Sequence, residues 1–317
     1  MFFFDSEMHL WPPMDDLSYY PNFKTYLNSI AGIGHRLGFA RGVAERGRGK
    51  VEADVDSLIE SMDEGGVQMG CVLPEVMLEL SYGHRVRSTN GFIAEAVAKY
   101  PDRLVGVANV GPILQRGVKN AIWELEYLVK ERGFKACKLY PPDGDPINHK
   151  DLWPFYEKVQ ELGIPLFIHV GFAWVAPGKT QYCLPVLLED VCNDFPEIPI
   201  VAYHMGYPYC DELNMEAAKY KNLYIGTSLM AGLTGGRPRQ AQKLVGEAIA
   251  WAGIDKLIWG TDWSGAMVRH KEQVDFVKNL QISEEVQRDY GYSPLGEEDK
   301  AKWAGLNLAR IMKIEPK

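Results

Sequence analysis

Short apolar runs alternate with amphipathic segments along most of the 317-residue chain. One such run is residues 67–73, and residues 55–64 before it have apolar side chains at the spacing of a helix face. Runs that are apolar on both faces are typical of parallel strands covered by helices. The alternation therefore predicts an α/β fold built on a parallel sheet.

Eight such β segments can be counted, and nearly all of them precede a helical segment. The expected strands cover residues 2–9, 67–73, 104–110, 134–140, 164–170, 198–204, 223–228 and 256–262. The expected helices cover residues 55–64, 91–99, 121–131, 152–162, 184–195, 213–220, 240–252, 272–279 and 301–312. Eight βα units in a chain of this length predict a (β/α)8 TIM barrel. An open, doubly wound sheet is the alternative.

A long irregular stretch, residues 10–50, interrupts the alternation directly after the first strand. Connections of this length are more often functional than featureless, so we expect an insertion that acts as a lid. The rest of the chain has no low-complexity tract and no sign of a second domain. We therefore expect residues 1–317 to form a single barrel domain, although the length alone would also fit two modest domains.

The overall composition limits which partners and which cellular compartment we expect. The formal net charge of −8 argues against nucleic acid and against an anionic membrane surface as partners. No apolar run approaches the roughly 20 residues of a membrane helix, and the start lacks the pattern of a secretory signal. The five cysteines fit neither a disulfide framework nor a thiolate zinc site. A cytoplasmic protein is the expectation.

Metal-capable side chains gather at the ends of four of the eight expected strands. They are Asp5, Glu7, His9, His169, His204 and Asp262. The first three alternate along one strand and so share one face. Because the active site of a barrel lies at the carboxyl ends of its strands, the pattern predicts a metal centre there. The alternatives are a polar solvent face on the first strand and satisfied core histidines on the others.

Other polar residues give weaker indications. Lys138 ends the fourth expected strand, where it either faces substrate or pairs with a carboxylate beneath the site. His84 could reach a ligand from the loop after the second strand. The remaining histidines, His35, His149 and His270, are expected at the surface.

These motifs together resemble the amidohydrolase superfamily. The resemblance rests on Asp5-x-Glu7-x-His9, on the two His-x-Gly motifs at His169 and His204, and on the Gly-Thr-Asp-Trp motif that contains Asp262. Further support comes from residues 98–106, 133–139 and 305–311. The chain is similar in particular to the branch that holds aminocarboxymuconate semialdehyde decarboxylase and the ortho-hydroxybenzoate decarboxylases. The resemblance covers nearly the whole chain.

The resemblance implies one divalent metal ion, zinc or manganese, and assigns roles to the residues of the motifs. The implied metal ligands are Glu7, His9, His169 and Asp262. Asp262 is the implied proton donor, His204 is a second catalytic or substrate-binding group, and Asp5 is structural or supports the ligands. Relatives tend to be dimers or tetramers, so a homo-oligomer is expected.

Glu7 departs from the commoner first-strand motif of the superfamily, which is His-x-His. With one carboxylate in the shell, a divalent ion keeps a net charge of +1, which favours an acidic bound water and hydrolysis. Adding Glu7 lowers the formal charge to zero. We therefore expect a non-oxidative decarboxylase of a hydroxylated aromatic or related unsaturated carboxylic acid. The alternatives are a hydrolase or hydratase acting on a lactone or unsaturated dicarboxylate, and a barrel with a structural metal.

A planar aromatic acid needs apolar walls and a partner for its charge. Four aromatic side chains lie within a few residues of the proposed ligands: Trp11, Trp174, Tyr207 and Trp263. Core packing is the alternative role for each of them. Arg41 or Arg85 could pair with a second anionic group of the substrate, and His84 could contact it. The expected partner is thus a small-molecule carboxylic acid.

Overall fold

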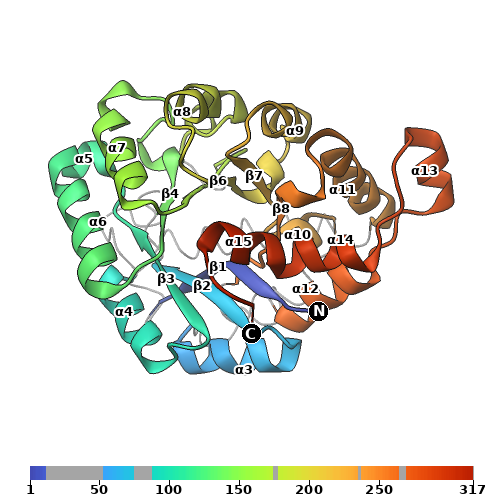
Figure 1. Ribbon diagram of the computed structural model, residues 1–317, viewed down its shortest axis with the longest axis horizontal. Coiled ribbons are helices and arrows are strands. Elements are labelled where there is room, and N and C mark those ends of the chain that lie inside the picture. Colours follow the sequence, from blue (N-terminus) through green and yellow to red (C-terminus); the bar gives the residue numbers. More distant parts are fainter. Residues whose placement is uncertain (12–52, 75–87, 174–177, 235–236, 264–268, 317) are drawn as a thin grey trace.

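Eight parallel strands form the centre of the molecule (Figure 1). The computed structural model describes residues 1–11, 53–74, 88–173, 178–234, 237–263 and 269–316. The strands are β1 (Phe4–Leu10), β2 (Met69–Pro74), β3 (Leu104–Asn109), β4 (Ala136–Leu139), β5 (Leu166–Ile168), β6 (Ile200–Ala202), β7 (Leu223–Gly226) and β8 (Leu257–Ile258). They are hydrogen-bonded in sequence order, and each pair is parallel.

The segment after β8 closes the ring against β1. Met8 and Trp263 form a parallel bridge. The backbone N–H of Ser6 donates to Trp259 O at 3.2 Å, and that of His9 donates to Trp263 O at 2.7 Å. The predicted (β/α)8 barrel is therefore confirmed.

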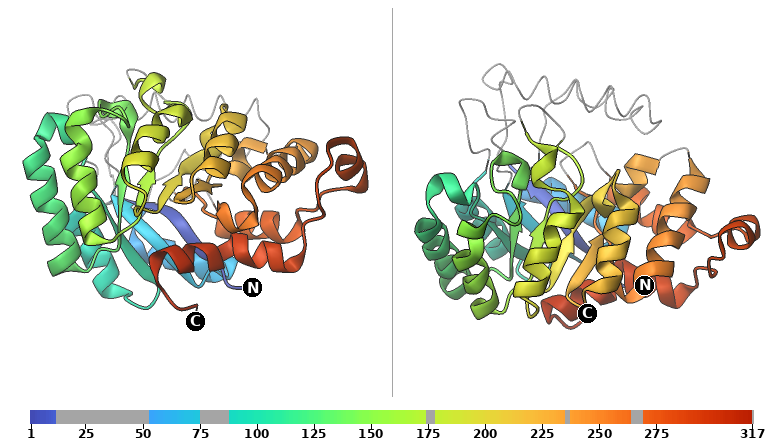
Figure 2. Two further views of the ribbon diagram at one scale, coloured as in Figure 1. Left: turned by 45° about the horizontal axis from the view of Figure 1, so that its top comes forward. Right: turned by 90° about the horizontal axis from the view of Figure 1, so that it is seen from above.

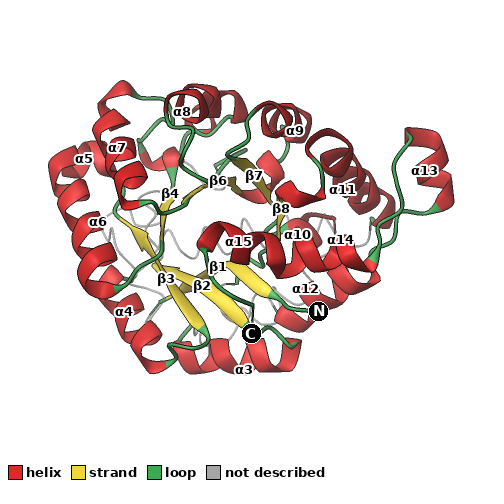
Figure 3. Ribbon diagram, viewed as in Figure 1, coloured by secondary structure: helices red, strands yellow, loops and turns green. Residues whose placement is uncertain are grey.

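Helices surround the strands (Figures 2 and 3). They are α3 (Val55–Gly65), α4 (Asn90–Lys99), α5 (Ile113–Arg116), α6 (Val118–Arg132), α7 (Trp153–Leu162), α8 (Leu188–Asp194), α9 (Cys210–Lys219), α10 (Met230–Thr234), α11 (Pro238–Ala252), α12 (His270–Asn279), α13 (Glu284–Tyr290), α14 (Glu297–Ala301) and α15 (Asn307–Met312). Helix α3 shows how the sequence sets these bounds. The Asp54 carboxylate caps its first turn by accepting from two backbone N–H groups, and Gly66 ends it at φ +70°. Helices α5, α10 and α13 were not predicted, and α14 was predicted only at its last residue.

Two apolar layers hold the elements together. One lies between the strands and the surrounding helices. The other fills the inside of the barrel, where Phe4, Phe167 and Val201 pack together with Leu308 of α15. Helix α15 packs against β1 and β8, and both chain ends lie at this end of the barrel (Figure 2). The amino ends of the strands are thus covered, and the site lies at the opposite, carboxyl end.

All eight strands are shorter than the sequence predicts, and for three of them this affects the site. β5, β6 and β8 end before His169, His204 and Asp262, so these side chains follow the strands instead of ending them. His204 and Asp262 have φ values of +58° and +59°, which an extended strand cannot accommodate. The backbone leaves the sheet where the candidate ligands begin.

Some of the predictions fall outside the described residues. The lid at residues 10–50 does so except for its first two residues, and Arg41, His84, Arg85 and Trp174 do so entirely. Among the helices that the structure does describe, none is both long and apolar enough to cross a membrane.

Candidate metal centre

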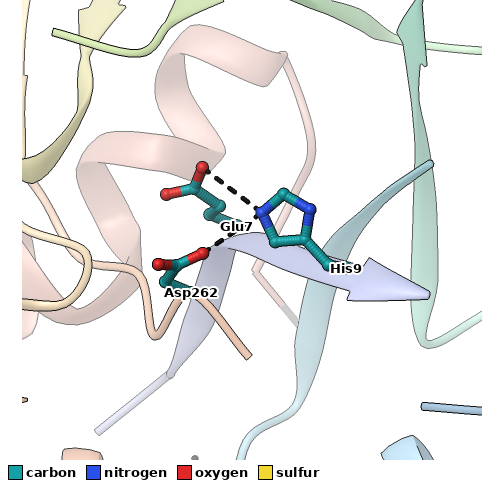
Figure 4. Close-up of side chains that lie close together, drawn as sticks. All are labelled: Glu7, His9 and Asp262. Atoms are coloured by element: carbon teal, nitrogen blue, oxygen red, sulfur yellow. Dashed lines mark ion pairs between the residues drawn. The ribbon is translucent and has the colours of Figure 1, made fainter. Parts of the chain in front are cut away.

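Glu7, His9 and Asp262 converge at the carboxyl end of the barrel (Figure 4). His9 Nε2 lies 3.7 Å from Glu7 Oε1 and 3.1 Å from Asp262 Oδ1. One potential ligand atom from each residue lies within 4.8 Å of the other two. Alternation along β1 points Glu7 and His9 the same way. The backbone bond from Trp263 N to Glu7 O, at 3.3 Å, brings the chain after β8 alongside them.

The chemistry of this cluster fits a divalent cation. Two carboxylates and an imidazole are a ligand set used by zinc and by manganese. Glu7 Oε2 is buried and has no hydrogen-bond partner among the described residues, which leaves a strong acceptor for an ion. The side chains of His9 and Asp262 are 13% and 22% exposed, so the cluster is open toward the rim of the barrel. A catalytic metal site keeps such an opening, whereas a structural one is closed.

Lys138 of β4 balances the charge of Glu7 inside the barrel. Its Nζ donates to Glu7 Oε1, and both side chains are buried. The ammonium also lies 3.9 Å from the centre of the Tyr203 ring, a cation–π contact. Burial alone would raise the pKa of the Glu7 carboxyl. The Lys138 ammonium and a hydrogen bond with the His9 side chain outweigh burial and hold that pKa well below its usual range.

His169 and His204 form a neutral hydrogen-bonded chain beside the acidic cluster. His169 Nε2 lies 2.7 Å from Phe172 O, which can only accept, so this nitrogen carries the proton. His169 Nδ1 then accepts from His204 Nε2 at 3.0 Å, and His204 Nδ1 accepts from the Ser228 hydroxyl at 3.2 Å. Burial lowers the pKa of both imidazoles, most strongly that of His169. His169 is not among the residues whose potential ligand atoms lie within 4.8 Å of one another, and its Nε2 is engaged by Phe172 O.

Asp5 and His270 lie next to the segments that carry the cluster. The Asp5 carboxylate is fully buried and accepts from the backbone N–H groups of Glu7 and Thr261, both at 3.0 Å. His270 Nε2 lies 3.2 Å from Asp5 Oδ2. The expectation that His270 lies at the surface is wrong: it is buried at the start of α12. Nothing in the sequence near position 270 indicates that the start of a helix will be buried between β1 and α3.

The backbone around the site adopts conformations that side chains disfavour. Of five non-glycine residues with positive φ among the described residues, four lie two to four residues after the end of a barrel strand: His204, Met205, Leu229 and Asp262. Such conformations cost about 1–3 kcal/mol each and persist where the surroundings fix them. No residue with a side chain can replace Gly171 without a shift of the backbone, because a Cβ there would lie 2.2 Å from Tyr207 O. The strain is concentrated at the carboxyl rim.

The described aromatic candidates divide into two groups. Tyr207 is half-buried, and its ring lies 6.4 Å from that of Phe172 beside the histidine chain. Trp263 is only 2% exposed and stacks on His270 with the ring centres 6.2 Å apart. Trp11 is equally buried. Trp263 and Trp11 therefore have the surroundings of core residues. A further ring, Tyr140, lies 4.7 Å from His169 and was not singled out from the sequence.

Comparison with known proteins gives the family and two kinds of relative. The family described as amidohydrolase matches residues 4–313. The chain is 25% identical over 285 residues to a gamma-resorcylate decarboxylase from Polaromonas sp., covering 75% of this chain and 84% of that protein. It is 30% identical over 136 residues to a 2-keto-4-carboxy-3-hexenedioate hydratase from Sphingobium sp., covering 38% of this chain and 40% of that protein.

Solved structures resemble the chain along nearly its whole length. A TIM-barrel protein of Bordetella bronchiseptica matches with a TM-score of 0.73 and 19% identity over 99% of both chains. A dihydroxybenzoic acid decarboxylase from Polaromonas sp., solved with manganese and the inhibitor 2-nitroresorcinol, matches with a TM-score of 0.64. It is 20% identical, with 98% of this chain and 97% of that chain covered. At such identities the likeness concerns the fold.

Proposed function

Since the chain belongs to the amidohydrolase family, we propose that it is a metal-dependent decarboxylase of a hydroxylated aromatic or related unsaturated carboxylic acid. The observation that carries this proposal is the cluster of Glu7, His9 and Asp262 at the open rim of the barrel. The similarity to a gamma-resorcylate decarboxylase over most of both chains favours this reaction. The partner would be a small-molecule carboxylic acid. A cytoplasmic location and a dimer or tetramer stay predictions.

Glu7, His9 and Asp262 would hold one divalent ion, zinc or manganese. His169 stays a proposed fourth ligand, although Phe172 O engages its Nε2 in the structure. When bound, the ion supplies a Lewis acid that withdraws negative charge from a substrate oxygen. Lys138 binds Oε1 of Glu7, and Oε2 has no partner among the described residues. The carboxylate can therefore pair with Lys138 through one oxygen and serve as a ligand through the other.

Asp262 is the proposed proton donor. Its carboxyl proton would move to the ring carbon that bears the carboxylate. The electron pair of the carbon–carbon bond would return to the ring as carbon dioxide leaves, so that a proton replaces carbon dioxide. Asp262 would regain its proton from solvent, which its partial exposure supports. His204 is the second candidate, but it is buried and both its ring nitrogens are hydrogen-bonded.

Substrate would lie against the rim next to these groups. Tyr207 stays in the proposed substrate-binding set because its half-buried ring adjoins the histidine chain. Trp174, Arg41 and His84 stay in it as predictions from the sequence alone. Trp263 leaves the set, because its ring is buried against His270. Apolar walls of this kind would orient a planar acid without competing for its charge.

Lys138 gives the hydrolase or hydratase alternative a specific argument. The ion pair of Glu7 with Lys138 has no net charge, so an ion held with His9 and Asp262 would keep a formal charge of +1. The expectation that Glu7 weakens water activation included the negative charge of Glu7 but not the positive charge of Lys138. The similarity of 136 residues to a 2-keto-4-carboxy-3-hexenedioate hydratase also favours this alternative. A reaction that adds water to an unsaturated dicarboxylate or a lactone is thus the second candidate.

Mass spectrometry on two substrate panels separates the candidates. Protein loaded with manganese or zinc would be incubated with hydroxybenzoates and, separately, with unsaturated dicarboxylates and lactones. Loss of carbon dioxide from a hydroxybenzoate, absent in Asp262→Asn, would establish the proposed reaction. Gain of water in the second panel with the first unchanged would instead establish the alternative.

A further inference from the structure

One oxygen of Asp5 joins the two segments that carry the proposed ligands. Asp5 Oδ1 accepts from the backbone N–H of Glu7 and from that of Thr261, at 3.0 Å each. Thr261 precedes Asp262, and its hydroxyl accepts from the backbone N–H of Trp263 at 3.1 Å. Both neighbours of Asp262 are therefore fixed. This matters because Asp262 holds a left-handed conformation that needs such support.

The second oxygen of Asp5 faces His270. Asp5 Oδ2 accepts from the Thr261 hydroxyl and lies 3.2 Å from His270 Nε2. The same nitrogen lies 3.3 Å from Met8 Sδ. Both neighbours are acceptors, so Nε2 carries a proton, and Nδ1 forms a hydrogen bond with the Ser61 hydroxyl at 2.8 Å. The imidazole therefore has a fixed orientation in a fully buried position.

Two helices hold His270 in this position. Ser61 and Gly65 lie on α3, and His270 begins α12. A Cβ on Gly65 would lie 2.6 Å from His270 Cβ and 2.9 Å from its backbone carbon, so the two helices touch at this glycine. The Trp263 ring stacks on the imidazole from the side of the site. Packing between α3 and α12 thus determines where the imidazole meets Asp5.

We propose that His270 is a positioning residue for the metal centre. Acting through Asp5, it fixes the backbone at Glu7 and at Asp262, so that metal affinity and ligand geometry depend on the contact between α3 and α12. Residues that orient ligands from behind typically change metal affinity about 10–100-fold when they are replaced. The inference rests on the proposed metal-dependent function, and it concerns residues that touch neither ion nor substrate.

The test measures metal binding independently of turnover. Affinity for Mn²⁺ is determined by titration calorimetry, and the visible absorption of the Co²⁺-loaded protein reports ligand geometry. His270→Leu should raise the dissociation constant about 10–100-fold and alter the Co²⁺ spectrum. His270→Gln should retain most of the affinity, since its amide N–H can still donate to Asp5. Ser61→Ala, which removes one hydrogen bond to the ring, should raise the dissociation constant about two- to tenfold.

Val159→Ala serves as the matched control. Val159 is fully buried on α7, so its truncation lowers the free energy of unfolding without touching this network. A weaker metal affinity in this control, equal to that of His270→Leu, would overturn the inference by showing that general destabilisation is sufficient. Unchanged affinity and spectrum in His270→Leu would overturn it as well.

Failure of the proposed function gives a different result. A wild-type protein that binds Mn²⁺ at one site but releases no carbon dioxide would refute the decarboxylase and leave the positioning role supported by the His270 variants. A wild-type protein that binds no divalent ion would overturn both. If His270→Leu does not fold, Ser61→Ala and His270→Gln still test the role, because both retain a ring or an amide in the buried position.

Discussion

The two sides of the carboxyl rim are built on opposite electrostatic principles. On the side of β1 and β8, Glu7 forms an ion pair with Lys138 of β4, and His9 Nε2 lies 3.1 Å from the Asp262 carboxylate. On the side of β5 and β6, His169 and His204 are joined by hydrogen bonds, and burial keeps both rings neutral. Both sides include left-handed residues that lie two to four residues after the end of a strand. The geometry is similar, but the first side offers charge and the second offers neutral donors and acceptors.

This difference indicates that one side binds the ion and the other orients the substrate. A cation is held by anionic oxygens, and the charged side supplies them together with an open Oε2 on Glu7. A neutral chain of imidazoles can orient a substrate or its leaving group without competing for the ion.

Asp262→Asn should reduce turnover most. The amide cannot deliver a proton to carbon, and it removes one anionic ligand. Since positioned proton transfer contributes about 10²–10⁴-fold, a loss of kcat of at least that size is expected. Steady-state assays with parallel metal analysis would measure it, and far-UV circular dichroism should be unchanged. An Asp262→Asn protein with normal turnover would remove this residue from the proposed mechanism.

Glu7→Gln should destabilise the apo-protein strongly. It leaves the Lys138 ammonium buried without a carboxylate, and breaking a buried pair in this way costs about 3–5 kcal/mol. The double variant Glu7→Gln/Lys138→Met should regain much of that free energy of unfolding without regaining metal affinity. Urea unfolding at neutral pH measures the first quantity and metal titration the second. Equal stability of the single variant and the wild type would contradict the buried pair.

The same pair has a defined pH dependence. The folded-state pKa of Glu7 is held well below that of the unfolded chain, so its contribution to stability is complete above the unfolded pKa of about 4.3. That contribution is lost as the pH falls through the folded-state pKa. The stability difference between wild type and Glu7→Gln should therefore shrink only below about pH 4.3. Shrinkage already near pH 6 would assign the effect to another group.

The fold followed from the sequence because its determinants are local. Apolar runs recur eight times, most of them are followed by a helix face, and each predicts its own element. What the sequence did not predict is where the strands end. β5, β6 and β8 stop early because the residues after them take up turns held by distant groups, such as the Asp5 bonds to Thr261. Helix α13 is short and mostly polar, so its sequence resembles a loop.

The site could be predicted only in part, because many of its contacts join residues that lie far apart in the sequence. Glu7, His9 and Asp262 were found because alternation on one strand and the order of strands in a barrel place them together. The partners behind them gave no comparable signal. His270, Ser61 and Ser228 lie on helices or in turns, and only tertiary packing brings them to the site. Lys138 was recognised as a candidate, but the choice between substrate and Glu7 needed the fold across the barrel.

His204→Gln should flatten the acid side of the stability profile. Burial depresses the folded-state pKa of His204, so the unfolded chain binds more protons below about pH 6.5. The free energy of unfolding therefore decreases as the pH is lowered below that value, by up to about 1.4 kcal/mol per pH unit for each such imidazole. Urea unfolding of the apo-protein at pH 7, 6 and 5 would show a smaller fall in His204→Gln. Val159→Ala, which replaces no titratable group, is the control and should leave the slope unchanged.

Ser228→Ala should have the smallest effect and test the neutral side directly. The Ser228 hydroxyl donates to His204 Nδ1, and its loss should cost about 1 kcal/mol of unfolding free energy. Without that donor, the Nδ1 tautomer of His204 becomes accessible, which ¹⁵N chemical shifts of the ring would reveal. Ser6→Ala is the matched control: its hydroxyl is also buried but has no partner among the described residues, so stability should not fall. If both variants lose the same free energy and the His204 shifts stay as in the wild type, the hydroxyl does not set the tautomer, and the neutral chain begins at His204 itself.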